Sequence, residues 1–294
     1  MKQMKTNLLF NKKTVFSFEV FPPKKTSPLE TIYSTLRELG YFKPDFISVT
    51  YGAGGSLNGQ TTIDIAHSVK HTYGIESVAH LPGINFDKAE MQKILHDLKC
   101  AGIDNVLALR GDINPNVQPK DDFRYASELV TFIKENGDFN VIGACYPEGH
   151  LEAATLKQDL IHLKEKVNAG TDQLISQLFF DNDYFYAFLD KARDMGVNVP
   201  IEAGIMPVTN KNQIERMVSM CGVNLPKKFK QMMEKYEHHP DAFRDAGIAY
   251  AIDQIVDLVS QDVDGIHLYT MNNSYIARRI SEAVSTLLAV PKSE

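Results

Sequence analysis

The sequence predicts an α/β fold of the (β/α)8 class, the TIM barrel. Short runs rich in β-branched and aromatic residues alternate with longer amphipathic segments from end to end, which is typical of strand–helix units around a parallel sheet. Eight such units fit the 294 residues. The open doubly wound alternative usually has a Gly-rich phosphate turn after its first strand. Here PPKKTSP follows the first run, and the loop YGAGGS misses GxGxxG because Leu57 replaces its last glycine.

The predicted strands are spread evenly along the chain, and they cover 14–21, 45–52, 76–81, 105–111, 140–147, 173–180, 199–208 and 264–270. Between them lie segments with apolar residues spaced near 3.6, several of which end in glycine as helices do. The segment 210–261 is too long for one helix, so we expect two or three helices there. No domain boundary is visible, which predicts one domain over 1–294.

Composition indicates a globular protein. Hydrophobic residues make up 44% of the sequence, and the net charge is −6. The sequence has no basic stripe of the kind that would indicate nucleic-acid binding. No apolar run approaches the roughly 18 residues of a membrane span, and the basic start has too short an apolar part for a signal peptide. We therefore expect a cytoplasmic protein without nucleic-acid or membrane partners. Cys100, Cys145 and Cys221 are odd in number and far apart, which predicts buried free thiols and no disulfide framework.

In a (β/α)8 barrel the working residues lie at the carboxyl ends of the strands. Polar residues gather at these positions in this sequence. They are Glu19, Thr50, Tyr51, His80, Arg110, Gly111, Asp112, Tyr146, Glu148, His150, Gln177, His267 and Tyr269.

Glu19 is the one acid in the apolar run FSFEVFPP (16–23). By alternation it shares a strand face with Ser17, and both faces of a barrel strand are largely buried. Burial without a cationic partner favours the protonated carboxyl group, which could then donate a proton at neutral pH. The alternative is an internal ion pair with an arginine such as Arg110.

Asp112 and Gln177 are the next candidates. Asp112 follows Gly111 at the end of LALRGD, where glycine permits a sharp exit and close approach by a ligand. Capping of a turn or helix is its alternative role. Gln177 stands in the predicted strand of ISQLFFD, and a buried amide needs partners for its donor and its acceptor. It is either paired with backbone or directed at a bound heterocycle.

Metal and nucleophile chemistry have weaker signals. His80, His150 and His267 end separate strands, but no HxH or HExxH spacing supports a metal site. There is no GxSxG motif, and Cys145 is most simply a core residue.

Taken together, these strand ends resemble the methylenetetrahydrofolate reductase family, in its bacterial type with the catalytic domain only. The matching segments are FSFEVFPP, SVTYGAGG, the His-Leu of AHLPG, NVLALRGD, YASELV, ACYPEGH, DLIHLKEKVNAGTD, ISQLFFD, GIMPV and HLYTMN. The resemblance implies a flavoprotein with FAD, and with NADH or NADPH as co-substrate. It implies ping-pong reduction of 5,10-methylenetetrahydrofolate to 5-methyltetrahydrofolate, in one-carbon metabolism and methionine supply. It also implies a homo-oligomer.

The resemblance assigns roles to residues. Glu19 becomes the proton donor, Asp112 lies near the flavin and the pterin, and the Gln177 amide serves nicotinamide and pterin in turn. All three are then catalytic and substrate-binding residues. The implied flavin contacts are Thr50, Tyr51, Ala53, His80, Arg110, Gly111, Asp112, Tyr125, Ala126, Ala144, Tyr146, His150, Asp159 and Lys166.

Some positions depart from the bacterial pattern, namely Pro82 and Gly83 after His-Leu, Glu165, Lys211 and Asn273. They put cofactor affinity and substrate contacts in question more than the reaction. We expect no C-terminal regulatory domain, since the sequence ends at Glu294. Two alternatives stay open: a metal-dependent or Schiff-base lyase that uses Glu19 or Asp112 as base, and a catalytically silent flavin- or folate-binding homologue.

Overall fold

The structure is a computed structural model that describes residues 4–11, 13–23, 27–51, 59–112 and 118–292. Within these residues eight parallel strands close into a barrel in which each strand pairs with the next and β1 pairs with β8. The strands are β1 (Val15–Val20), β2 (Phe46–Val49), β3 (Glu76–Pro82), β4 (Asn105–Leu109), β5 (Asn140–Cys145), β6 (Gln173–Ser176), β7 (Ile201–Ile205) and β8 (Gly265–Tyr269). The predicted fold class is confirmed, and each of the eight predicted ranges contains one of these strands.

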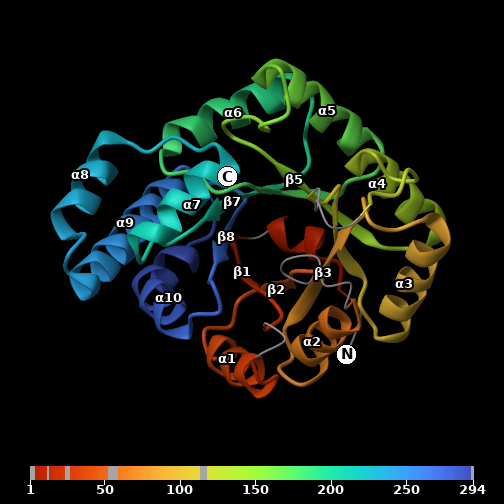
Figure 1. The fold of residues 1–294 in the computed structure, drawn as a ribbon, viewed down its shortest axis with the longest axis horizontal. Coiled ribbons are helices and arrows are strands. Elements are labelled where there is room, and N and C mark those ends of the chain that lie inside the picture. The colour runs from red at the N-terminus through yellow and green to blue at the C-terminus, as the bar shows by residue number, and fades with distance from the viewer. Residues whose placement is uncertain (1–3, 12, 24–26, 52–58, 113–117, 293–294) are drawn as a thin grey trace.

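The helices form a ring around the strands (Figure 1). They are α1 (Glu30–Gly40), α2 (Gly59–His71), α3 (Lys88–Cys100), α4 (Ala126–Asn136), α5 (Leu156–Asn168), α6 (Asn182–Asp194), α7 (Lys211–Cys221), α8 (Lys227–Tyr236), α9 (Pro240–Ser260) and α10 (Ser274–Leu288). Three of them, α7, α8 and α9, lie between β7 and β8, as the length of 210–261 predicts. Figure 1 shows α8 at the outer edge of the ring. Among the described residues, no helix has the length and apolar character needed to cross a bilayer.

The strands are apolar on both faces because each face meets a different part of the core. In β1, Phe16, Phe18 and Val20 pack in the layer between the barrel and the helices. Val15 packs inside the barrel, in a cluster that includes Phe46 and five further buried residues from other segments. The odd-numbered positions of β1 therefore face the barrel interior, which directs Ser17 and Glu19 inward as well.

A short N-terminal 3-10 helix, η1 (Thr6–Asn11), covers the amino ends of the strands. It is the red helix across the middle of the ring in Figure 1. The Thr6 backbone N–H donates to Asn105 Oδ1 at 2.9 Å, and its hydroxyl bonds Gln173 Oε1 at 2.8 Å. Both partners are the first residues of their strands. The amino end of the barrel is thus filled by protein, and a ligand site belongs at the carboxyl end.

The cysteines are free thiols, as predicted, but not all are buried. Cys145 is buried on β5, Cys221 is partly buried, and Cys100 is exposed. The expectation of burial is wrong for Cys100, because it ends α3 on the face turned away from the barrel.

Candidate active site at the carboxyl end of the barrel

Glu19 lies near the carboxyl end of β1, and its side chain is 20% exposed. The basic groups within ion-pair distance are two imidazoles: His80 Nε2 at 3.6 Å and His267 Nε2 at 3.9 Å from Glu19 Oε2. Arg110 is not its partner, because the Arg110 guanidinium binds both carboxylate oxygens of Glu152, one of them at 2.7 Å. The ion-pair alternative for Glu19 and Arg110 is therefore wrong. In the described part of the chain, no lysine or arginine pairs with Glu19.

His80 supplies no positive charge to this carboxyl group at neutral pH. Burial lowers the pKa of His80 to about 4, with the nearby Glu19 opposing the shift and His267 adding to it. Its Nε2 atom is buried, and among the described residues it makes no hydrogen bond. The nitrogen that faces Glu19 is thus uncharged and available for a ligand or for the carboxyl group.

A second carboxyl group lies below Glu19 inside the barrel. Glu202 on β7 is fully buried, and its Oε1 accepts a hydrogen bond from the Ser17 hydroxyl at 2.7 Å. The same Ser17 oxygen lies 2.6 Å from His267 Nδ1. Glu202 is not among the residues predicted from the sequence, although it carries the same signal as Glu19, an acid in an apolar strand.

Asp112 and Gln177 lie at the same end of the barrel, after β4 and β6. Gly111 turns the chain with a φ of 90°, which favours glycine, and leaves Asp112 exposed. Asp112 is close enough to Arg110 and Tyr146 to raise the pKa of both, as a minor contributor to each shift. This position at the rim agrees with a role toward a ligand.

Gln177 corrects the predicted strand. β6 ends at Ser176, so Gln177 lies just beyond it and is only partly buried. Its backbone N–H donates to Cys145 O at 2.7 Å, and its own Oε1 accepts from the Leu178 N–H at 2.9 Å. Among the described residues its Nε2 makes no hydrogen bond, and neither a hydrogen bond nor an ion pair joins Glu19, Asp112 and Gln177 to one another. These three groups surround the mouth of the barrel without touching.

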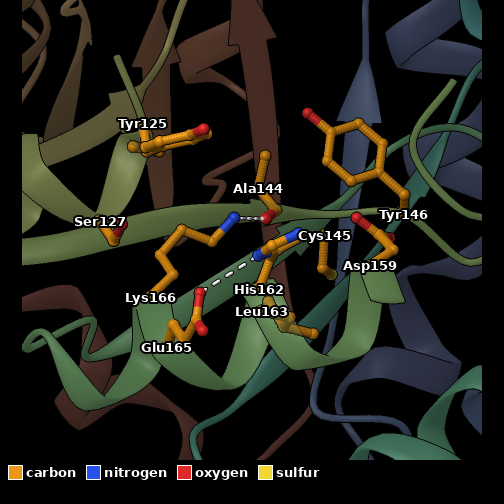
Figure 2. Close-up of a pocket in the computed structure, with 11 residues that line it drawn as sticks. Tyr125, Ser127, Ala144, Cys145, Tyr146, Asp159, His162, Leu163, Glu165 and Lys166 are labelled. Atoms are coloured by element: carbon orange, nitrogen blue, oxygen red, sulfur yellow. Dashed lines mark hydrogen bonds and ion pairs between the residues drawn. The ribbon is translucent and has the colours of Figure 1, made fainter. Parts of the chain in front are cut away.

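A cavity of about 320 Å³ lies beside the mouth, between α4, α5 and the carboxyl end of β5. Figure 2 shows the exposed ring of Tyr125 on one side and Tyr146 with Asp159 on the other. Six residues of the predicted flavin set line it together: Tyr125, Ala126, Ala144, Tyr146, Asp159 and Lys166. Ser127, Cys145, His162, Leu163 and Glu165 complete the lining.

Charge is distributed unevenly in this cavity. The Lys166 ammonium group donates to the backbone oxygen of Ala144, and burial lowers the pKa of Lys166. Burial raises the pKa of Asp159, against the attraction of Lys166. Glu165 binds His162 Nδ1 at 3.1 Å, as the dashed line in Figure 2 shows. The cavity thus offers hydrogen-bonding groups of both kinds and no free cluster of cations.

The other described residues of the predicted flavin set lie outside this cavity, around the mouth. His150 packs edge-on against Tyr146 with ring centres 4.7 Å apart, which connects the cavity to the mouth. Tyr51 packs edge-on against Phe86, and burial raises its pKa to about 12. Thr50, His80, Arg110 and Gly111 follow at neighbouring strand ends. Ala53 falls in 52–58, outside the described residues.

The departures from the family pattern have local structural roles. Lys211 begins α7 and pairs with Glu237 at 2.7 Å. Asn273 caps α10, where its Oδ1 accepts from the Ile276 N–H at 3.2 Å. Pro82 ends β3 and packs against Gly111. A Cβ atom at position 111 would lie 2.9 Å from Pro82 Cβ, so the glycine makes room for the proline.

The fold and the site define a (β/α)8-barrel enzyme with the Glu19 carboxyl group at the barrel mouth and a cavity beside the mouth. The sequence profile of the methylenetetrahydrofolate reductase family matches residues 3–285. The chain belongs to this family, and it is an oxidoreductase with methylenetetrahydrofolate reductase activity.

Curated relatives agree with the family assignment, and solved structures agree with the fold. The chain is 36% identical to the 5,10-methylenetetrahydrofolate reductase of Pectobacterium carotovorum and 35% identical to that of Escherichia coli, over 90% of this chain and 88% of each relative. It is 35% identical to methylenetetrahydrofolate reductase (NADH) 1 of Arabidopsis thaliana, of which it covers 46%. In fold it is similar to a Clostridium thermocellum protein described as binding two copies of 5-methyl-5,6,7,8-tetrahydrofolic acid, with a TM-score of 0.69 at 14% identity over 97% of this chain and 99% of that one. Tryptophan synthase from M. tuberculosis shares the barrel at a TM-score of 0.54 and 10% identity, over 96% of this chain and 99% of that one.

Proposed function

We propose that this barrel reduces 5,10-methylenetetrahydrofolate with FAD as cofactor and a nicotinamide dinucleotide as hydride source. The observation that carries the proposal is the convergence of six predicted flavin contacts on one cavity at the carboxyl end of β5. These residues come from α4, β5 and α5, which are separated in sequence. We further propose that residues 1–294 act as one catalytic domain in a homo-oligomer, which light scattering on the purified protein would test.

The chemistry of the cavity fits the nucleotide half of FAD. The ring of Tyr125 is 63% exposed and offers a face for stacking a heterocycle. The Asp159 carboxylate can accept from sugar hydroxyls, and the small side chains of Ala126 and Ala144 leave room for close approach. Because α4 begins at Ala126, its first N–H groups suit a phosphate. When bound, FAD supplies a two-electron centre that takes hydride from the nicotinamide and passes it to the folate.

Glu19 acts as the proton donor in this proposal. The carboxyl group protonates N10 of the folate, so that the bond between N10 and the bridging carbon breaks and the N5 iminium forms as hydride acceptor. No cation pairs with Glu19 in the described chain, and His80 is uncharged near pH 7. The Glu19 carboxyl group therefore faces no fixed positive charge from that side. After proton transfer the imidazole of His80 can turn its N–H toward the new carboxylate.

Asp112 and Gln177 orient the ligands at the rim. The exposed Asp112 carboxylate can accept hydrogen bonds from N–H groups of the pterin. The Gln177 carbonyl is occupied by Leu178, so its amide nitrogen is the part left to donate to a carbonyl of nicotinamide or pterin. A single donor group at this position agrees with nicotinamide and folate binding to the same site one after the other.

Two observations test the proposal together. The purified protein should show flavin absorbance, or acquire it with added FAD, and NADH or NADPH should bleach it without oxygen. Methylenetetrahydrofolate should then restore the colour, with 5-methyltetrahydrofolate as product. A protein that binds no FAD contradicts the proposal. Flavin that is bleached but not restored by the folate indicates the silent homologue instead.

A further inference from the structure

Glu202 is a fully buried acid that the reaction described above does not use. It projects from β7 into the barrel, where the neighbouring strand β8 has Gly265. A side chain at Gly265 would come within 2.7 Å of Glu202 Cγ, so the glycine makes the space for this acid. A carboxyl group at such a place is costly unless it is neutral or has a partner. The barrel therefore holds it by a specific arrangement.

Ser17 is the only hydrogen-bond partner of the Glu202 side chain in the described chain. Glu202 Oε1 lies 2.7 Å from Ser17 Oγ, while Glu202 Oε2 is buried without a partner. Ser17 Oγ lies 2.6 Å from His267 Nδ1. On the other side of the ring, His267 Nε2 lies 3.4 Å from Ser48 Oγ and 3.9 Å from Glu19 Oε2. Two short hydrogen bonds and one longer approach of 3.9 Å thus connect the buried acid to Glu19.

The Ser17 hydroxyl has one hydrogen to donate, so its direction depends on Glu202. If Glu202 is protonated, it donates to Ser17, and Ser17 donates to His267 Nδ1. The uncharged imidazole then carries its hydrogen on Nε2, facing Glu19. If Glu202 is ionised, Ser17 donates to Glu202, His267 donates from Nδ1 to Ser17, and Nε2 faces Glu19 as an acceptor.

We infer that Glu202 is a positioning residue that sets, through Ser17, which nitrogen of His267 carries the proton opposite Glu19. This inference rests on the proposed role of Glu19 as proton donor and deepens it. With the hydrogen on Nε2, the ring can donate to the carboxylate that Glu19 becomes after it protonates the folate. No bond between heavy atoms is made or broken. When Glu202 ionises, one proton leaves this row of groups for solvent, and the hydrogen bonds between Glu202 and Ser17 and between Ser17 and His267 reverse direction.

The switch lies in an accessible pH range. Burial raises the pKa of Glu202 to about 8, while the Ser17 hydrogen bond opposes the shift and the charges of Asp45 and Asp264 add to it. His80, with its pKa lowered to about 4, and Tyr269, with its pKa raised well above 10.0, face the same space and do not titrate near pH 8. At neutral pH Glu202 therefore holds its proton and His267 presents Nε2–H to Glu19.

Nitrogen NMR on protein labelled at histidine tests this directly, since protonated and unprotonated ring nitrogens have distinct shifts. The chain has nine histidines, and His267→Gln identifies the signal of this one by its loss. In the folate-free protein we expect Nε2 to be protonated at pH 7 and the hydrogen to move to Nδ1 as pH rises through about 8. The expected result is a loss of the Nε2–H signal with one midpoint.

Two variants separate the switch from a structural role. Glu202→Gln keeps a donor to Ser17 at every pH, so the Nε2–H form should persist beyond the wild-type midpoint. Ser17→Ala cuts the connection and should remove the step while the fold is kept. Glu148→Gln is the matched control, because Glu148 is another carboxyl with a pKa raised by burial but is bound to Asn224. That variant should keep the wild-type step.

A His267 signal that does not change between pH 7 and 9, or a step that survives in both Glu202→Gln and Ser17→Ala, would overturn the inference. The same preparations are assayed for reduction of methylenetetrahydrofolate at pH 7. Activity without the tautomer step defeats this inference and leaves the proposed function standing. A tautomer step in a protein without this activity supports the inference and contradicts the proposed function.

Discussion

Replacing Glu202 by glutamine should make the stability of the protein less dependent on pH. Glu202 has an ordinary pKa of 4.5 that burial raises to about 8 in the folded protein. Between these values the folded state binds a proton that the unfolded state has lost, so the free energy of unfolding falls as pH rises. The contribution of Glu202 is complete below about pH 4.5 and lost above about pH 8. Glutamine does not titrate, so it makes no pH-dependent contribution to stability.

The size of the effect follows from linkage. Each pH unit inside this window costs about 1.4 kcal/mol. From about pH 5.5 to about pH 7.5, the wild-type protein should therefore lose about 3 kcal/mol of stability relative to Glu202→Gln. Because Glu202 is fully buried, screening by solvent reduces this little.

The assay is urea unfolding of both proteins at both pH values. Circular dichroism and tyrosine fluorescence serve as probes, since the chain has no tryptophan. The quantity of interest is the difference in free energy of unfolding between the two proteins, and how it changes with pH. Taking this difference cancels the contributions of the other titrating groups. A difference that stays constant from one pH to the other would refute the reasoning, because Glu202 would then be ionised in both states.

Two further predictions concern packing and the cofactor. Gly247→Ala should destabilise the protein by about 3 kcal/mol or more, because the added carbon would overlap the backbone oxygen of Val208 where α9 crosses the end of β7. Urea unfolding midpoints measure this loss, and Gly40→Ala is the control, which should be nearly neutral because its added carbon would lie 3.7 Å from Ile75. Equal destabilisation by the two substitutions would contradict the account. Tyr125→Ala should weaken FAD binding by about 5-fold to 150-fold, from the loss of about 1–3 kcal/mol of stacking. Quenching of FAD fluorescence measures this loss, Tyr125→Phe should retain most of the affinity, and wild-type affinity in Tyr125→Ala would refute the stacking role.

The strands were predictable because each is apolar on two faces over a short run. The residues at which the strands end were harder to predict. The sixth predicted strand extends to 180, yet β6 ends at Ser176. Phe179 and Phe180 are fully buried for another reason, since they pack on Phe185 of α6 and Phe229 of α8 beyond the barrel edge. Burial in a loop and burial in a strand leave the same apolar pattern in the sequence.

The site was predictable where a residue is unusual for its surroundings, and not where it depends on a distant partner. Glu19 stands out as an acid in an apolar strand. Its relation to Glu202 does not, because Ser17 and Glu202 are 185 positions apart in sequence. Arg110 likewise finds Glu152 from the next loop, 42 positions away. Closure of the barrel brings Ser17 to Glu202, and the pairing of β4 with β5 brings Arg110 to Glu152.

The central claim is that Glu19 donates the proton to the folate, and the Glu19→Gln variant tests it most directly. Glutamine keeps the size and polarity of the side chain but holds no acidic proton. Stopped-flow absorbance should show bound flavin reduced by the nicotinamide at close to the wild-type rate. Reoxidation by methylenetetrahydrofolate should fall by at least about 100-fold, as expected for loss of a general acid. Equal loss of both half-reactions, or reoxidation at the wild-type rate, would contradict the account.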